Sequence, residues 1–194
     1  MLRSVPPNES LVDRAVRGDT AATGQLLKQL APSMIRAARS LMGATHLDVD
    51  DVVQQSLIGL VQSLPAFRGE CSIAHFASRI VTRTALAARR RGALRTERHD
   101  DSIDPDMFAV DASQGEAYEA ERRRQSVRAL MEKLPEEQAE TLAMRVVLGF
   151  SLEEVAEATG VPLNTVRSRV RLAKTALKKR IEADPQLAAA LEVE

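Results

Sequence analysis

The sequence is short of the residues that mark several common classes of protein. It has one cysteine among 194 residues, no tryptophan, and aromatic side chains at only 3% of positions. A single cysteine excludes a disulfide framework and a metal site built from clustered cysteines. The strand-type alternation of apolar and polar residues is also missing, and alanine and leucine dominate the apolar positions. This composition predicts an all-α protein.

Long apolar runs are missing as well. None approaches the roughly 20 residues of a membrane-spanning helix, and the first residues lack the apolar segment of a signal peptide. We therefore expect a soluble, cytoplasmic protein with no membrane insertion. The formal net charge is zero, but the charges are segregated, because two basic stretches flank an acidic one.

The stretch 151–180 predicts two helices joined by a tight turn. Ser151 followed three residues later by Glu154 is a capping box, which marks a helix start. Gly160 stands where the chain must reverse, and Pro162 suits the first turn of the next helix because its missing N–H costs nothing there. This pattern is typical of a helix-turn-helix.

The second helix of this motif, expected from Val161 to Arg180, contains basic residues and no acidic one. An apolar stripe through Val166 and Ala173 leaves the bases on the remaining faces. Such a helix fits the DNA major groove, with its first half at base edges and the rest on phosphates. A solvated surface helix is the simpler interpretation, but the capping, the turn and the one-signed charge together favour DNA binding.

A second basic helix is expected from Ile73 to about Arg91. Its apolar residues fall on one face, and the arginines are expected to face outward as a second nucleic-acid contact: Arg79, Arg83, Arg89, Arg90 and Arg91. The helix expected before it, at 48–64, has acidic residues in its first turn and a polar, weakly charged face. That face belongs either to a plain bundle helix or to a helix that docks a partner. Pro32 predicts a kink or break in the helix expected from about 20 to 41.

Between the two basic stretches, residues 97–121 carry acidic side chains against a single base, Arg98. This composition predicts a linker that is extended or disordered alone. It either solubilises the protein, folds back on the basic helices and damps DNA binding, or threads a basic channel in a partner. We therefore expect a domain at 8–96, a linker at 97–120, a second domain at 121–182 and an acidic tail at 183–194.

Taken together, these stretches resemble bacterial RNA polymerase sigma factors of the extracytoplasmic-function (ECF) class. Residues 48–91 resemble the family's second region, with an acidic helix start, an apolar helix ending at Leu-Pro-Ala-Phe-Arg-Gly and then a basic helix. Residues 134–180 resemble its fourth region, with Leu-Pro, a helix and a helix-turn-helix containing Thr-Val-Arg-Ser-Arg. The resemblance covers the chain from Glu9 to Arg180. It implies a helical bundle of region 2 type and a helix-turn-helix of region 4 type joined by the acidic linker.

The resemblance implies an alternative sigma factor and not an enzyme. Such a protein binds core RNA polymerase and directs initiation at promoters with −35 and −10 DNA elements, under the control of an anti-sigma factor. Its region 2 helix would dock on the clamp helices of the largest polymerase subunit, and its second domain on the flap of the second-largest subunit. The linker would pass through the RNA-exit path.

The resemblance also assigns residues to these roles. The implied polymerase contacts are Asp51, Gln54 and Gln55. The implied −35 contacts are Asn164, Thr165, Arg167, Ser168, Arg171 and Lys174. The implied −10 contacts are Phe67, Arg68, His75, Phe76, Arg79, Arg83 and Arg90.

One departure from the family pattern concerns the −10 helix. His75 and Phe76 stand where members often have tryptophan and a second aromatic residue. Stacking on aromatic side chains holds single-stranded bases with about 1–3 kcal/mol each. Strand capture is therefore expected to depend on Phe67, Phe76, the loop backbone and the arginines.

Other functions fit the sequence less well. Catalytic residues and a cofactor are not expected, because Ser, His and Asp residues are scattered without a catalytic arrangement and no Gly-rich phosphate loop occurs. A metal is not expected either, since Cys71 and His75 supply only two ligands and the other histidines have no spacing relation to them. The alternative is a two-domain helix-turn-helix transcriptional regulator that acts without binding the polymerase core. In such a regulator the second basic helix would have no use.

Overall fold

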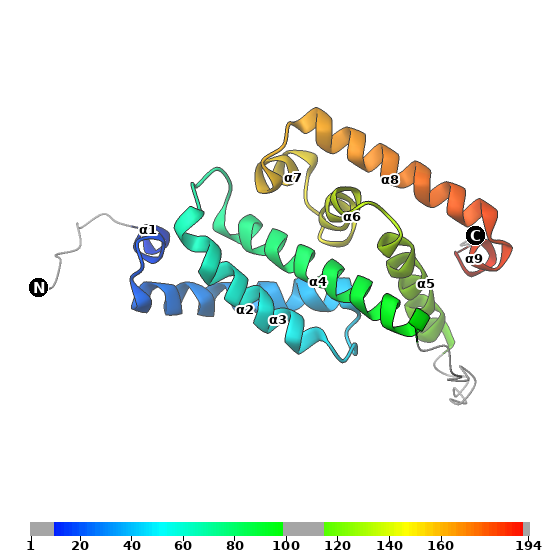
Figure 1. The fold of residues 1–194 in the computed structure, drawn as a ribbon, viewed down its shortest axis with the longest axis horizontal. Coiled ribbons are helices and arrows are strands. Elements are labelled where there is room, and N and C mark those ends of the chain that lie inside the picture. Colours follow the sequence, from blue (N-terminus) through cyan, green and yellow to red (C-terminus); the bar gives the residue numbers. More distant parts are fainter. Residues whose placement is uncertain (1–9, 99–114, 192–194) are drawn as a thin grey trace, which may run out of the picture.

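The structure, a computed structural model, describes residues 10–98 and 115–191. In these ranges the chain is helical and contains no strand, which confirms the predicted all-α fold. Figure 1 shows the helices in order along the chain. Their bounds are α1 Leu11–Val16, α2 Thr20–Met42, α3 Val49–Ser63, the short 3₁₀ helix η1 Leu64–Ala66, α4 Ile73–Arg98, α5 Gly115–Glu132, α6 Glu136–Leu142, the π-helical turn η3 Ala143–Val147, α7 Leu152–Thr159, α8 Leu163–Ala183 and α9 Pro185–Leu191.

The first domain is a bundle in which α2, α3 and α4 pack against one another, with α1 across the start of α2. The helices begin where side chains satisfy free backbone N–H groups. Ser10 and Asp13 form a capping box at α1, and the Asp19 carboxylate accepts from the N–H groups of Ala21 and Ala22 at α2. The bundle core contains fully buried side chains from the three long helices: Leu26, Met34, Leu41, Val52, Leu60 and Val81.

The second domain packs α6, α7 and α8 together, with α5 and α9 at the end of α8. Met144, Val155 and Val166 are fully buried and form the small core of the helix-turn-helix. Other buried residues of this domain, such as Leu134, Ala139 and Leu142, belong to a larger cluster that also includes residues of the first domain.

The two domains are in direct contact. Figure 1 shows α4 with the helices of its own bundle on one side and with α6 and α7 on the other. Buried residues from both domains belong to one continuous cluster, which joins Val81 and Ala85 of α4 to Ala139 and Leu142 of α6. Helix α4 is thus the central element of the molecule.

Several helix bounds differ from those predicted. Helix α4 continues to Arg98 and α5 already begins at Gly115, so both ends of the expected linker at 97–120 are helical, and its central part, 99–114, lies outside the described residues. Helix α2 runs through Pro32 without a break. Proline has no N–H to donate to the carbonyl four residues earlier in the helix. Because Pro32 is exposed, that carbonyl can accept a hydrogen bond from water instead.

Candidate nucleic-acid and polymerase interfaces

The helix-turn-helix is built as its sequence predicts. Ser151 accepts from the N–H of Glu154 at 3.0 Å, and the Glu154 carboxylate accepts from the N–H of Ser151 at 2.7 Å. Gly160 ends α7 with a φ of 68°, in the left-handed region that glycine tolerates best. Pro162 is the N-cap residue of α8. These local features set where α7 ends and where α8 begins.

The exposed face of α8 carries most of the residues expected at the −35 element. Val166 and Ala173 turn inward and are buried, while the opposite side presents the predicted set: Asn164, Arg167, Ser168, Arg171 and Lys174. Thr165 is half-buried. Arg167 donates to the Asn164 amide oxygen at 3.2 Å, which keeps these two side chains together on the first turns of the helix. A basic neighbour, Arg169, turns toward α6 instead and pairs with Glu137.

The loop expected at the −10 element forms a small cavity beside the second domain. The rings of Phe67 and Phe76 lie 5.0 Å apart with their planes tilted by 51°. A cavity of about 320 Å³ has these rings on one side and Glu157 and Gly160 of the helix-turn-helix on the other. Arg68 is exposed at the rim. The aromatic pair thus faces α7 rather than open solvent.

Cys71 lies in the same cavity. Burial raises the pKa of its thiol, and the negative charge of Glu157 raises it further. The thiol is therefore held in its neutral form at neutral pH. Among the described residues no group of three or more His, Cys, Asp and Glu side chains is placed to hold a metal ion.

His75, at the place of an expected aromatic pair, contacts the second domain. Its ring lies 4.7 Å from the ring of Phe150, and its Nε2 is 3.6 Å from a carboxylate oxygen of Glu154. Its Nδ1 is buried without a hydrogen-bond partner. In this arrangement His75 helps to join the two domains.

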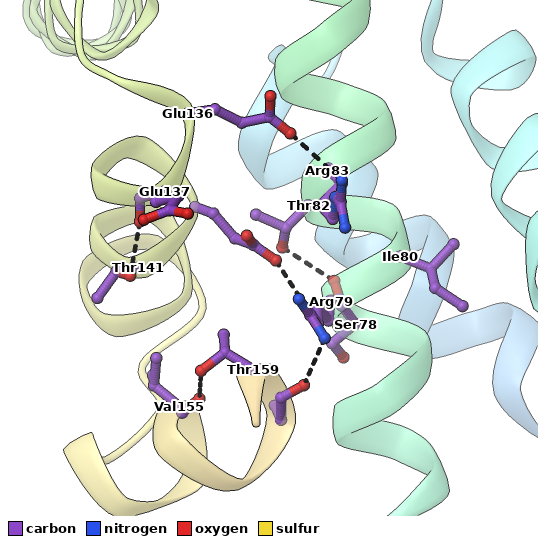
Figure 2. A network of polar contacts seen from close by, with 12 residues as sticks. Ser78, Arg79, Ile80, Thr82, Arg83, Glu136, Glu137, Thr141, Val155 and Thr159 are labelled. Atoms are coloured by element: carbon purple, nitrogen blue, oxygen red, sulfur yellow. Dashed lines mark hydrogen bonds and ion pairs between the residues drawn. The ribbon is translucent and has the colours of Figure 1, made fainter. Parts of the chain in front are cut away.

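The arginines of α4 do not all face outward, and the prediction that they do is wrong. Arg79 donates from Nε to Glu140 at 2.9 Å and from Nη1 to the carbonyl of Ala158 at 3.3 Å, which places it between α6 and α7 (Figure 2). Arg83 is half exposed and lies 3.4 Å from Glu136. The reason is that the expected outer face of α4 is covered by the second domain.

The arginines nearer the end of α4 continue this pattern. Arg89 is 10% exposed and pairs with Glu132 at 2.5 Å while it also donates to the Met42 carbonyl at 3.2 Å. Arg90 donates to the carbonyl of Leu134 at 3.1 Å and lies 3.8 Å from Glu136. Of the five arginines expected to face outward, Arg83 and Arg91 are exposed.

The face of α3 expected to dock a partner is exposed. Asp51, Gln54 and Gln55 all face solvent, and the Gln55 amide donates to the Asp51 carboxylate at 3.4 Å. Sequence reasoning missed the apolar part of this face. Ile58 is 50% exposed and Val61 is 40% exposed, although an apolar side chain on a bundle helix is usually expected to face inward. Ile58 and Val61 follow Gln54 by four and seven residues, a spacing that puts all three on the same face of a helix. This spacing could have identified them from the sequence.

Two family models match the chain in the order of its two domains. Sigma-70 region 2 matches residues 26–95, and sigma-70 region 4 matches residues 124–177. The ECF RNA polymerase sigma factor SigD of Mycobacterium tuberculosis is 31% identical over 181 residues, which cover 90% of this chain and 84% of that protein. The ECF RNA polymerase sigma-E factor of Haemophilus influenzae is 28% identical and covers 90% of this chain and 95% of its own.

A solved structure shares the fold. CnrH, in its complex with the cytosolic domain of CnrY, superposes with a TM-score of 0.52 at 24% sequence identity, covering 90% of this chain and 96% of that one. The fold and the two matching family models define a sigma-70-type protein with regions 2 and 4. The chain belongs to the ECF family of RNA polymerase sigma factors.

Family membership decides between the functions left open by the sequence. The protein is an alternative sigma factor, a transcription initiation factor and not an enzyme. The alternative of a regulator that acts without the polymerase core is set aside, because both sigma regions match and stand in the expected order. The family implies RNA polymerase and promoter DNA as partners. Within the described ranges no helix is long and apolar enough to cross a membrane.

Proposed function

We propose that the exposed face of α8 reads the −35 element of a promoter. Arg167 and Arg171 stand one helical turn apart on that face, and a guanidinium can donate two hydrogen bonds to one guanine. Asn164, Thr165 and Ser168 are proposed to add neutral polar contacts at the start of the helix, and Lys174 is proposed to contact a phosphate. The exposure of five of these six residues on one face, all but the half-buried Thr165, is the observation that carries the proposal.

The loop after α3 and the first half of α4 are proposed to read the −10 element and hold its separated strand. Phe67 and Phe76 form an aromatic pair with a cavity beside it, which suits one unstacked base. Arg68 at the rim and His75 are proposed to contact the same strand. Arg79, Arg83 and Arg90 are proposed to contact the backbone phosphates once α4 is uncovered.

Helix α3 is proposed to dock on the clamp helices of the largest polymerase subunit. Its exposed face combines the hydrogen-bonding groups of Asp51, Gln54 and Gln55 with the apolar side chains of Ile58 and Val61. A polar patch beside exposed apolar residues is the usual make-up of a protein interface. The second domain is proposed to bind the flap of the second-largest subunit. Because the proposed partner is RNA polymerase, the protein is proposed to act in the cytoplasm.

An anti-sigma factor is proposed to control the protein by covering this docking face. The proposal follows from the exposed apolar residues of α3, which a free protein leaves in contact with water. A binding partner that competes with polymerase for them would hold the protein inactive.

Run-off transcription with purified core polymerase on a pool of promoter fragments tests the function. We expect specific transcripts that depend on this protein, and their start sites identify the −35 and −10 sequences. A protein that neither binds core polymerase nor supports any transcript would contradict the proposal. Gln54→Ala with Ile58→Ala should weaken polymerase binding, whereas Gln29→Ala, an exposed glutamine on α2, should not.

A further inference from the structure

A cavity of about 830 Å³ lies between the end of α2, helix α5, the π-helical turn η3 and α9. Small-molecule sites are usually clefts of roughly 300–1,000 Å³ and often lie at domain boundaries. None of the described residues that line this cavity belongs to the DNA or polymerase faces proposed above. The cavity is therefore a separate candidate for ligand binding.

Apolar side chains form most of the cavity wall. Val127 of α5 and Val146 of η3 line it and are 38% and 60% exposed, so both leave apolar surface in contact with water. Val146 stands on a π-helical turn, a geometry that is frequent at functional sites. Met131 and Leu191 extend the wall, and among the described lining residues there is no aromatic side chain on which a planar ring could stack. An alkyl chain is therefore the ligand body that this wall fits best.

Positively charged side chains line the same cavity beside the apolar wall. They are Arg39 of α2 and Arg123, Arg124 and Arg128 of α5, whereas Glu121 supplies the only carboxylate among the described lining residues. Glu121 accepts a hydrogen bond from Arg128 at 2.6 Å and one from Arg124 at 3.4 Å. One negative charge thus brings two guanidinium groups together without balancing both.

Arg128 and Glu121 form a fixed part of the site. The Arg128 side chain is 11% exposed and lies over Gly43, where an added Cβ would be 3.3 Å from its Nη1. The hydrogen bond from Arg128 holds the pKa of the Glu121 carboxyl below its usual 4.5, so Glu121 is ionised at neutral pH. The negative charge of Glu121 is therefore already used within the protein.

The other arginines leave positive charge for a ligand. Arg39 and Arg124 are exposed, and Arg123 lies 3.9 Å from the exposed carboxylate of Glu119. Exposed ion pairs of this kind are weak. Because a guanidinium can donate two parallel hydrogen bonds to a carboxylate, the charges favour a ligand with a carboxylate head.

We propose that the cavity binds a small aliphatic anion, with its carboxylate at Arg39 and Arg124 and its alkyl chain along Val127 and Val146. The carboxylate matches the excess of positive charge, and the chain covers apolar surface that otherwise contacts water. Dodecanoate is a simple molecule of this class and serves as the probe. The proposal goes beyond the proposed function and does not rest on it, because it uses no residue of the DNA or polymerase faces.

Isothermal titration calorimetry of the full chain with monomeric dodecanoate tests the proposal. We expect saturable binding at one site, with a dissociation constant that rises by up to about fourfold for each CH₂ removed in decanoate and octanoate. Acetate has the charge without the chain and 1-decanol has the chain without the charge, so each should bind several-fold more weakly than decanoate. An absence of saturable binding, or equal affinity for 1-decanol and decanoate, would overturn the proposal.

A pair of matched variants tests the position of the head group. Arg39→Gln with Arg124→Gln removes two charges from the cavity, and Arg36→Gln with Arg122→Gln removes two exposed charges from the same helices outside it. The cavity variant should bind dodecanoate several-fold more weakly than the wild-type protein, and the control variant should bind as the wild type does. Equal weakening in both variants would mean that only the net charge of the protein matters, and the site would be wrong.

Thermal unfolding and vesicle binding distinguish the cavity from other modes of binding. A ligand of the folded state stabilises it, so dodecanoate should raise the Tm of the wild-type protein and the control variant more than that of the cavity variant. A lowered Tm in all three proteins, as a detergent gives, would count against a site. If vesicles of phosphatidylglycerol sediment the protein while monomeric dodecanoate does not bind, the basic surface contacts membranes and the cavity proposal fails. These measurements use neither polymerase nor promoter DNA, so their failure is distinguishable from a failure of the proposed function.

Discussion

Arg79 and Glu140 are 61 positions apart in the sequence, and Arg79 donates from Nε to the Glu140 carboxylate at 2.9 Å across the domain boundary. The glutamate side chain is 7% exposed, so it has little access to water as a substitute partner. A residue assigned to DNA by its sequence context is therefore engaged in an internal contact. This single pair therefore links the stability of the domain contact to the availability of Arg79 for any other partner.

Arg79→Ala should destabilise the protein, because it leaves a buried carboxylate without its donor. The expected loss is about 1–3 kcal/mol in the free energy of unfolding. Arg83→Ala is the matched control on the same helix. Its pair with Glu136 is more than half exposed on both sides, and such pairs contribute less than about 1 kcal/mol. Urea denaturation followed by circular dichroism measures both, and equal losses would show that burial of the pair does not matter.

The turn of the helix-turn-helix depends on the backbone of Gly160. At a φ of 68° an alanine is strained, although nothing would touch its Cβ, so Gly160→Ala should cost about 1–2 kcal/mol of stability. Gly24→Ala is the opposite case, since Gly24 lies inside α2 with equally open space around it. There the substitution should stabilise by about 0.5–1 kcal/mol. Thermal unfolding compares the two, and a change of the same sign at both sites would contradict the conformational argument.

The Asp19 carboxyl at the start of α2 should make the free energy of unfolding depend on pH in the acidic range. Hydrogen bonds from the N–H of Ala22 and from Arg14 hold the pKa of the Asp19 carboxyl below its usual 3.8. Because the pKa of Asp19 is lower in the folded state, the ionised carboxylate contributes its full stabilisation at pH values above the usual pKa. This stabilisation is lost as the pH falls through the pKa of the folded state. Asp19→Asn keeps a capping oxygen but does not titrate there. The difference in unfolding free energy between the wild-type protein and Asp19→Asn should therefore shrink below about pH 3.8, and a pH-independent difference would count against the assignment.

The sequence predicted local structure better than contacts between domains. Ser151 and Glu154 cap α7, and Gly160 ends it, because these effects act within a few residues of the chain. The direction of Arg79 and Arg89 was missed because it depends on carboxylates about 40 to 60 residues away in a separate domain. Helical periodicity gives the apolar face of α4 but cannot say what covers the polar one.

The candidate polymerase face shows a related limit. Asp51, Gln54 and Gln55 were expected to face solvent and are exposed. Polar side chains on an amphipathic helix lie on the face opposite the apolar stripe, so their exposure is easy to predict. Ile58 and Val61 are partly exposed apolar residues, and apolar character alone would place them inside. Only the packing of α3 against α2 and α4 shows that the side carrying them is left uncovered.

Arg171 provides the sharpest test of the −35 assignment. Its side chain is exposed on α8, and a guanidinium paired with a guanine gives about 1–3 kcal/mol of discrimination. Arg171→Ala should weaken holoenzyme binding to the matched promoter by that amount and relax the base preference at one −35 position. Lys178, two turns further along and 77% exposed, is paired with Glu182 at 3.6 Å and lies beyond the proposed contact face. Lys178→Ala should therefore reduce affinity only slightly and equally for all sequences. Fluorescence anisotropy with promoter duplexes altered at single −35 positions distinguishes the two, and an Arg171→Ala variant that keeps the wild-type base preference would remove α8 from the −35 contact at this position.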